Sequence, residues 1–196
     1  SSDGYPRCVT TSPIFVSRLA KLPLVDADGS PIGRVHDVVV MPSGRHDPRV
    51  LGFLVAVQNR KIFLNAGRVL EIEPSGVRLR SGSIDVRRYK RRAGEQLANA
   101  DLVDTDVDGE RITDLAIALD PDHDVWRIST VALAQPGPFL RRRTPRVVPW
   151  SEVARAFDAG PEYAQVAEFR EMHPSDVAQR LRQLPLHHRR RLAELM

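Results

Sequence analysis

The feature that most constrains this chain is a series of short runs rich in β-branched residues, separated by turn residues. In the first part of the chain the runs are "DVVVM" (37–41), "RVLGFLVAV" (49–57), "KIFLNA" (61–66) and "GVRLR" (76–80). The segments between them, "PSGRHDP", "QNR" and "EPSG", are typical turns. Because no helix-length segment intervenes for the crossovers of a parallel sheet, the pattern predicts a small barrel or sandwich.

The same order of elements returns further along the chain. "DLVDTD" and "RITDLAIALD" predict a hairpin, "DVWRISTVALAQ" a longer strand, and "RRRTPRVVPW" another strand. Setting Gly29 on Gly109 places Asp28 on Asp108 and Val35 on Leu115, and "VVPWSEV" parallels "IFLNAGRV" as an exit from a strand. We therefore expect a second barrel. The tryptophans are expected in its core or rim, and the inward-facing candidates of both units are Val38, Val40, Leu51, Phe53, Val55, Ile62, Leu64, Leu115, Ile117, Leu119, Ile128, Val131 and Val148.

After Pro149 the character of the sequence changes. "SEVARAF", "PEYAQVAEFREM" and "PSDVAQRLRQL" carry apolar residues at a spacing of three to four, which predicts helices. His173 and Asp176 are interpreted as residues of a helix N-terminus, where an acidic side chain interacts favourably with the helix dipole. The last predicted helix, "LHHRRRLAELM", reaches Met196 with its apolar stripe barely begun. We expect further helices of the same chain after that point.

Two stretches resemble known families. "LPLVDADGSPIGRVHDVVV" (22–40) resembles the PRC-barrel domain of ribosome-maturation factors and photosynthetic reaction-centre H subunits. In the assumed alignment the second copy departs from the pattern, because Thr113 replaces Gly33 and Ile117 stands where Asp37 was. "FREMHPSDVAQRLRQLPLHHRRRLAEL" (169–195) is similar to the N-terminal superhelical domain of MgtE-type magnesium transporters, which is cytosolic there and helps to sense magnesium.

Together these observations predict a β+α chain of two tandem small PRC-like β-barrels followed by a short all-α superhelical segment. The expected divisions are a disordered tail (1–11), a first barrel (12–86), a basic linker (87–96), a divergent second barrel (97–157) and the start of an MgtE-N-like helical domain (158–196). The single cysteine, Cys8, excludes an internal disulfide and fits a reducing cytoplasm. No apolar run reaches the roughly 18 residues that a membrane span requires.

One motif raises the question of metal binding. "DTDVDGERITDL" (104–115) opens like a calcium-binding loop, with Asp104, Asp106 and Asp108 at alternate positions followed by Gly109. The twelfth position, which supplies the bidentate carboxylate of an EF-hand, is Leu115. An Asp-Gly hairpin turn therefore explains the motif better. These three aspartates are kept as candidates for weak binding of a divalent cation such as Mg²⁺, and no other cofactor is expected.

Charge and motifs narrow the expected function. The net charge is +4, with basic clusters at "RRYKRR" (87–92) and at two "RRR" runs. No GxSxG elbow, HExxH pair or phosphate-binding loop is present, so we expect no catalysis. The leading prediction is a non-catalytic cytoplasmic regulatory or scaffolding module that contacts another protein or further domains of its own chain, with a link to magnesium transport implied by the resemblance. The alternative is an RNA- or ribosome-associated protein that binds through Arg87, Arg88, Arg91 and Arg92.

Overall fold

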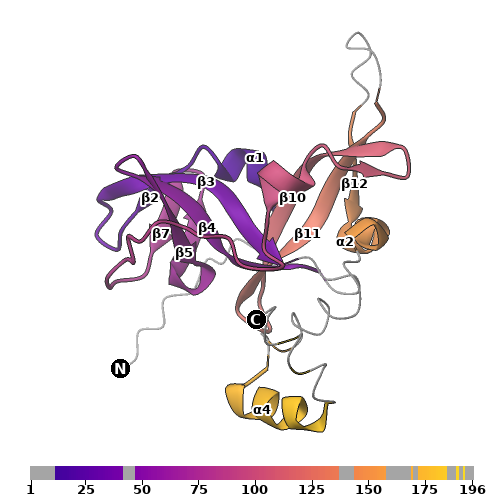
Figure 1. Cartoon of the computed structure of the whole chain (residues 1–196). Helices are drawn as coiled ribbons and strands as arrows, with labels where there is room; N and C mark the ends of the chain where they lie inside the picture. Colours follow the sequence, from indigo (N-terminus) through magenta and orange to yellow (C-terminus); the bar gives the residue numbers. More distant parts are fainter. Residues whose placement is uncertain are drawn as a thin grey trace, which may run out of the picture.

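The computed structural model describes residues 12–41, 47–136, 144–157 and 172–184, together with residues 169, 189 and 192. Twelve strands form one curled sheet (Figure 1). Its first half contains β2 (Pro23–Val25), β3 (Pro31–Met41), β4 (Arg49–Val57), β5 (Arg60–Asn65), β6 (Val69–Glu73) and β7 (Gly76–Leu79). Its second half contains β9 (Asp106–Val107), β10 (Glu110–Asp120), β11 (Val125–Ala134) and β12 (Arg146–Pro149).

Two further strands link the halves, because each precedes one half in the sequence but pairs with a strand of the other. β1 (Ile14–Phe15) precedes the first half in sequence but pairs with β10 of the second half. β8 (Gln96–Leu97) precedes the second half but pairs with β3 of the first. β11 and β4 meet at the seam, where Arg127 is the register partner of Arg49.

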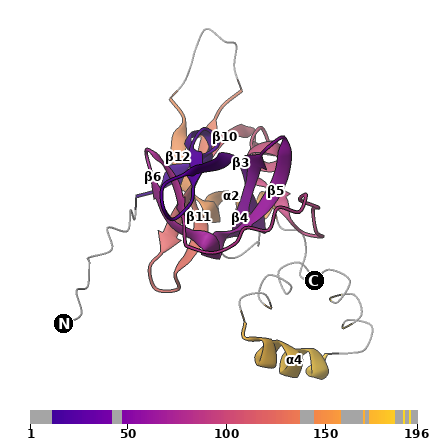
Figure 2. The ribbon, with the colours of Figure 1, turned by 90° about the vertical axis from the view of Figure 1, so that its left-hand side faces the viewer.

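The prediction of two tandem barrels is therefore wrong. A single 12-stranded sheet runs through both halves, and one continuous apolar core contains residues of both. Viewed from the side of the first half, its strands curl around that core (Figure 2). Most of the longer strands were predicted from their apolar runs, whereas β1, β6 and β8 were not. The error lies in the assumption that each unit closes on itself, because strand partners distant in sequence leave no local signature.

The two halves are related by an approximate internal repeat. Asp37 in β3 accepts hydrogen bonds from the backbone N–H of Val38 and of Asn99, which lies in the π-helical turn η2 (Ala98–Leu102) after β8. Asp114 in β10 accepts the corresponding bonds from Leu115 and from Ser17, which lies in α1 (Val16–Leu19) after β1. Each half thus supplies an aspartate that holds the helical turn at the start of the other.

This repeat corrects the sequence alignment. Asp37 matches Asp114, so Val38 matches Leu115, and a register shift between strands precedes each aspartate. The β9–β10 hairpin turns on two residues, Asp108 and Gly109, whereas five residues separate β2 from β3. Because the two turns differ in length, aligning Gly29 with Gly109 did not align the strands that follow these turns.

The core agrees with the prediction at all but two positions. The predicted inward-facing residues are buried, and Trp150 and Trp126 are buried as well. Leu51 and Leu119 are only half-buried. Both lie near the seam between the two halves, which is where the cleft described below opens.

Helices are short in the described part of the chain. They are α1, η2, the 3₁₀ turns η1 (Ala66–Arg68) and η3 (Ala154–Phe157), α2 (Trp150–Val153) and α4 (Pro174–Gln183). α4 begins as predicted, with His173 at the N-cap and Asp176 in its first turn. The predicted all-α superhelical segment is wrong for the described residues, where α4 is the one helix of ten residues. The helices predicted at 161–172 and 186–196 fall largely outside the described residues.

Candidate functional site

A cleft opens at the seam between the two halves of the sheet, and we call it the seam cleft. It has a volume of about 500 Å³. The first half contributes the start of β4, the end of β5, the turn η1 and the start of β6, and the second half contributes the β10–β11 hairpin. Its apolar wall includes Leu51, Leu70, Leu119, Val125 and Trp126.

The seam cleft coincides with a difference between the two halves of the internal repeat. Asn65 ends β5 and caps η1, just as Pro149 ends β12 and precedes α2. The next residue is Ala66 in the first half and Trp150 in the second. Trp150 is fully buried and stacks on Phe157, with ring centroids 5.1 Å apart. A small residue at the matching position of the first half leaves space unfilled.

The rim of the seam cleft is basic. Arg49, Arg80 and Arg92 line it, with the carboxylates Asp124 and Glu95. Asp124 and Arg80 form a long ion pair of 4.0 Å between exposed side chains, which stabilises little. Glu95 is buried, and its carboxylate already accepts hydrogen bonds from the Tyr89 hydroxyl at 3.0 Å and from the Arg92 N–H at 2.9 Å. Arg80 and Arg92 therefore lie on a rim where the exposed carboxylate is that of Asp124.

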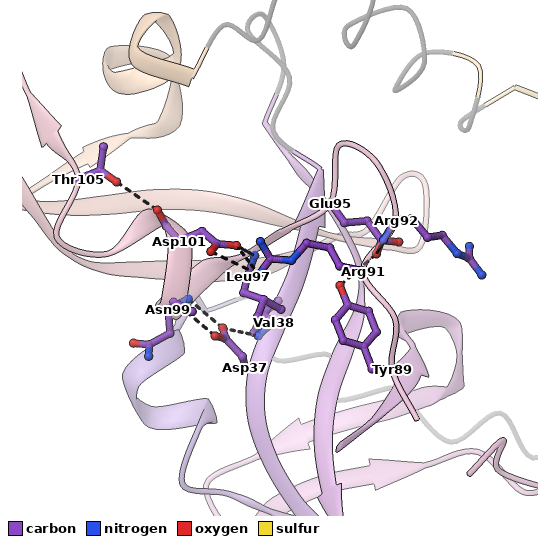
Figure 3. Close-up of polar contacts among 11 residues, drawn as sticks. Asp37, Val38, Tyr89, Arg91, Arg92, Glu95, Leu97, Asn99, Asp101 and Thr105 are labelled. Atoms are coloured by element: carbon purple, nitrogen blue, oxygen red, sulfur yellow. Dashed lines mark hydrogen bonds and ion pairs between the residues drawn. The ribbon is translucent and has the colours of Figure 1, made fainter. Parts of the chain in front are cut away.

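The segment 85–95 connects the two halves and lies against the edge of β5. Arg88 forms a bridge with Ile62, and the Tyr89 N–H donates to the carbonyl of Lys61. The Tyr89 ring stacks on Phe63, with centroids 6.1 Å apart. The Tyr89 hydroxyl bonds to Glu95 (Figure 3). Burial, followed by the negative charge of Glu95, raises the pKa of Tyr89 to about 12. The connector is thus docked on the sheet by an aromatic stack and a buried carboxylate.

The four arginines predicted to contact RNA divide into two pairs. Arg87 forms an ion pair with Asp85 at 2.6 Å, and its side-chain hydrogen bond lowers the pKa of Asp85 to about 2. Arg91 reaches Asp101 at 3.0 Å (Figure 3). Within the described ranges, the side chains of Arg88 and Arg92 have neither a hydrogen-bond partner nor an ion-pair partner. Lys90, which the sequence reasoning did not select, is in the same situation.

The three candidate metal-binding aspartates surround a hairpin turn. Asp108 and Gly109 have φ values of 52° and 83°, as a two-residue type I′ turn requires. The carboxylate of Asp106 accepts the N–H of Gly109 at 3.2 Å. In the described part of the chain no three histidine, cysteine, aspartate or glutamate side chains are grouped so that they could hold a metal ion. Binding of Mg²⁺ at Asp104, Asp106 and Asp108 stays a prediction.

The described histidines lie apart from one another. His36 contacts the Lys61 amine at 2.7 Å on the outer face of β3 and β5. His123 pairs with Asp120 at 2.9 Å within the β10–β11 hairpin. The start of β11 contacts the residues before β4, where the Arg127 guanidinium donates to the carbonyl of Asp47 at 3.2 Å and the Ile128 N–H to that of Pro48 at 2.9 Å. His46 itself lies outside the described residues.

Sequence reasoning missed the residues of the seam cleft. Arg49 and Arg80 lie singly in strand sequences, so no local cluster draws attention to them. The available signal was the parallel between "IFLNAGRV" and "VVPWSEV", in which a small residue stands opposite a tryptophan. Among the described residues no helix is long and apolar enough to cross a membrane. Neither a known family model nor a curated protein matches this chain.

Proposed function

We propose that this chain is a non-catalytic protein-binding module, and that the seam cleft takes an apolar segment of a partner protein that also carries carboxylates. The observation that supports the proposal is the combination of an apolar wall with a basic rim in a space that the internal repeat fills elsewhere. Leu70 is 51% exposed on this wall, so a bound apolar side chain would cover it. The regulatory or scaffolding role, the cytoplasmic location and the link to magnesium transport remain predictions.

The chemistry of the partner follows from the lining. Apolar side chains that enter the cleft would cover Leu70 and Trp126, and each large side chain buried contributes about 1.5–3 kcal/mol. Carboxylates on the same segment would face Arg80 and Arg49 on the rim, where charge pairs affect association rate and specificity more than affinity. An extended or helical peptide with alternating leucine or phenylalanine and acidic residues fits this arrangement.

The proposal is tested by selection of random displayed peptides on the full chain, followed by binding assays on variants. Ala66→Trp introduces into the first half the residue type that Trp150 provides at the matching position of the second half. Leu70→Ser removes an exposed apolar contact. The matched control is Val147→Ser, because Val147 is 56% exposed and lies outside the cleft. We expect selected peptides to lose at least about tenfold in affinity for Ala66→Trp and Leu70→Ser.

Charge is tested separately. Arg80→Glu is expected to weaken the same peptides roughly three- to tenfold, whereas Arg34→Glu, at an exposed position of β3 outside the cleft, is expected to have little effect. Peptides that bind all variants equally, or the absence of any enriched peptide, would contradict the proposal.

A further inference from the structure

We infer that Arg88, Lys90 and Arg92 form a second binding site, a row of cations that contacts the phosphate backbone of single-stranded nucleic acid. We call these three residues the cation row. The inference is independent of the seam cleft, with which the row shares only Arg92. Some charged side chains of the connector pair with other residues of the protein, and the others are exposed to solvent.

Engaged and unengaged side chains alternate along residues 87–92. Arg87, Tyr89 and Arg91 are engaged, by Asp85, by Phe63 with Glu95, and by Asp101, respectively. The residues between and after them are exposed and carry no side-chain partner in the described structure. In Figure 3 the Arg91 side chain reaches toward Asp101, whereas that of Arg92 points away from it.

The spacing of the cation row suits a polymer of phosphates. The bridge with Ile62 gives Arg88 a strand-like backbone. Alternate residues of such a backbone lie about 6.6 Å apart, which is similar to the separation of successive phosphates along one nucleic-acid strand. The connector is held in place by the Tyr89–Phe63 stack and by the bridge at Ile62, so the row is positioned before any ligand arrives. A connector whose backbone is already held loses less backbone entropy on binding.

The site is expected to recognise the backbone and not the bases. Tyr89 and Phe63 already stack on each other, so neither ring is offered to a base. The described connector contains no helix or two-stranded ribbon that could enter a duplex groove and read base edges. Phosphate contacts position a ligand without reading sequence, and the net charge of +4 favours the approach of any polyanion.

The test measures binding of the full chain to fluorescently labelled poly(U) RNA and poly(dT) DNA by anisotropy over a series of salt concentrations. The row variant is Arg88→Ala with Lys90→Ala and Arg92→Ala. Its matched control removes the same charge elsewhere, at the exposed residues Arg18, Arg111 and Arg155. The pair Arg88→Ala with Lys90→Ala tests the row without altering the lining of the seam cleft, and thermal melting checks that each variant is folded.

The expected result is a change in salt dependence. Three lost phosphate contacts reduce the slope of log K against log salt by about 2, and near physiological salt the affinity falls by roughly 10- to 100-fold. The control should keep the wild-type slope. Arg88→Lys with Arg92→Lys preserves charge and should keep most of the binding.

Three outcomes overturn the inference. The first is that the wild-type chain does not bind poly(U) or poly(dT) even at low salt. The second is that the row variant and the control lose the same affinity, which would mean that net charge alone determines binding. The third outcome is that the row is required for sedimentation with anionic phospholipid vesicles while the nucleic acids do not bind. That result would assign the row to a membrane surface.

Discussion

Replacement of Asp37 by alanine should destabilise both halves of the sheet, although Asp37 belongs to the first. Its carboxylate is 3% exposed and accepts three backbone N–H groups, from Val38 at 2.7 Å, from Asn99 at 2.8 Å and from Ala100 at 3.1 Å. Two of these donors lie at the start of η2, the turn through which the chain enters the second half (Figure 3). The substitution therefore removes hydrogen bonds that connect the first half to the start of the second.

The magnitude follows from the three donors. The Val38 N–H is buried, and the loss of a charged acceptor there costs about 1.5–3 kcal/mol. Asn99 and Ala100 are exposed residues, so water can replace part of the lost bond, at about 0.5–1 kcal/mol each. The sum is a loss of about 2.5–5 kcal/mol in the free energy of unfolding. For Asp114→Ala, at the matching but half-buried position, we expect about 1–2 kcal/mol.

The assay is urea denaturation, followed both by tryptophan fluorescence and by far-ultraviolet circular dichroism. Trp126 and Trp150 lie in the second half, so their fluorescence reports on the half that does not contain Asp37. We expect a single transition with the same midpoint for both probes, shifted to lower urea in Asp37→Ala. A loss below about 1 kcal/mol, a greater loss in Asp114→Ala, or an unchanged fluorescence midpoint would refute the reasoning.

Two further predictions concern the connector and β3. The pKa of Tyr89 is raised from its ordinary value of 10.0 to about 12, so the folded state favours the neutral phenol. The resulting stabilisation is present below pH 10 and is lost as the pH rises from about 10 to about 12. Chemical denaturation across this range should show the loss in the wild-type chain and not in Tyr89→Phe. Gly33→Ala should destabilise by about 1–3 kcal/mol, because a Cβ atom at Gly33 would lie 2.3 Å from the carbonyl oxygen of Ala56 in β4. Gly67→Ala, where the nearest atom is 3.2 Å away, is the matched control in thermal melting, and equal losses would contradict the argument from close approach.

The elements that sequence predicted best are those whose cause is local. Each short β-branched run bounded by turn residues became a strand, and Asp108–Gly109 became a two-residue turn because these residues tolerate positive φ. α4 begins at Pro174, where a missing N–H is tolerated. In each case the deciding interaction lies within a few residues, so the sequence alone contains it.

The candidate sites were predicted only in part, because they depend on contacts between distant residues. The basic segment 87–92 was selected from sequence. Which of its cations remain unpaired depends on partners such as Asp101, whose distance to Arg91 the sequence does not give. The seam cleft was not predicted. It requires Leu51 and Leu119, from different halves, to meet at a seam where the first half carries Ala66 and the second carries Trp150.

By itself the sequence determined the strand content, the turns, the approximate repeat and the basic character of the connector. Only the tertiary structure decided that the repeats share one sheet and one core, since β1 pairs with β10 and β8 with β3. The physical reason is that any open strand edge offers the same backbone donors and acceptors, so hydrogen bonding does not distinguish a neighbouring strand from a distant one. That choice depends on packing of the whole core and on Asp37 and Asp114, which each hold the helical turn of the other half.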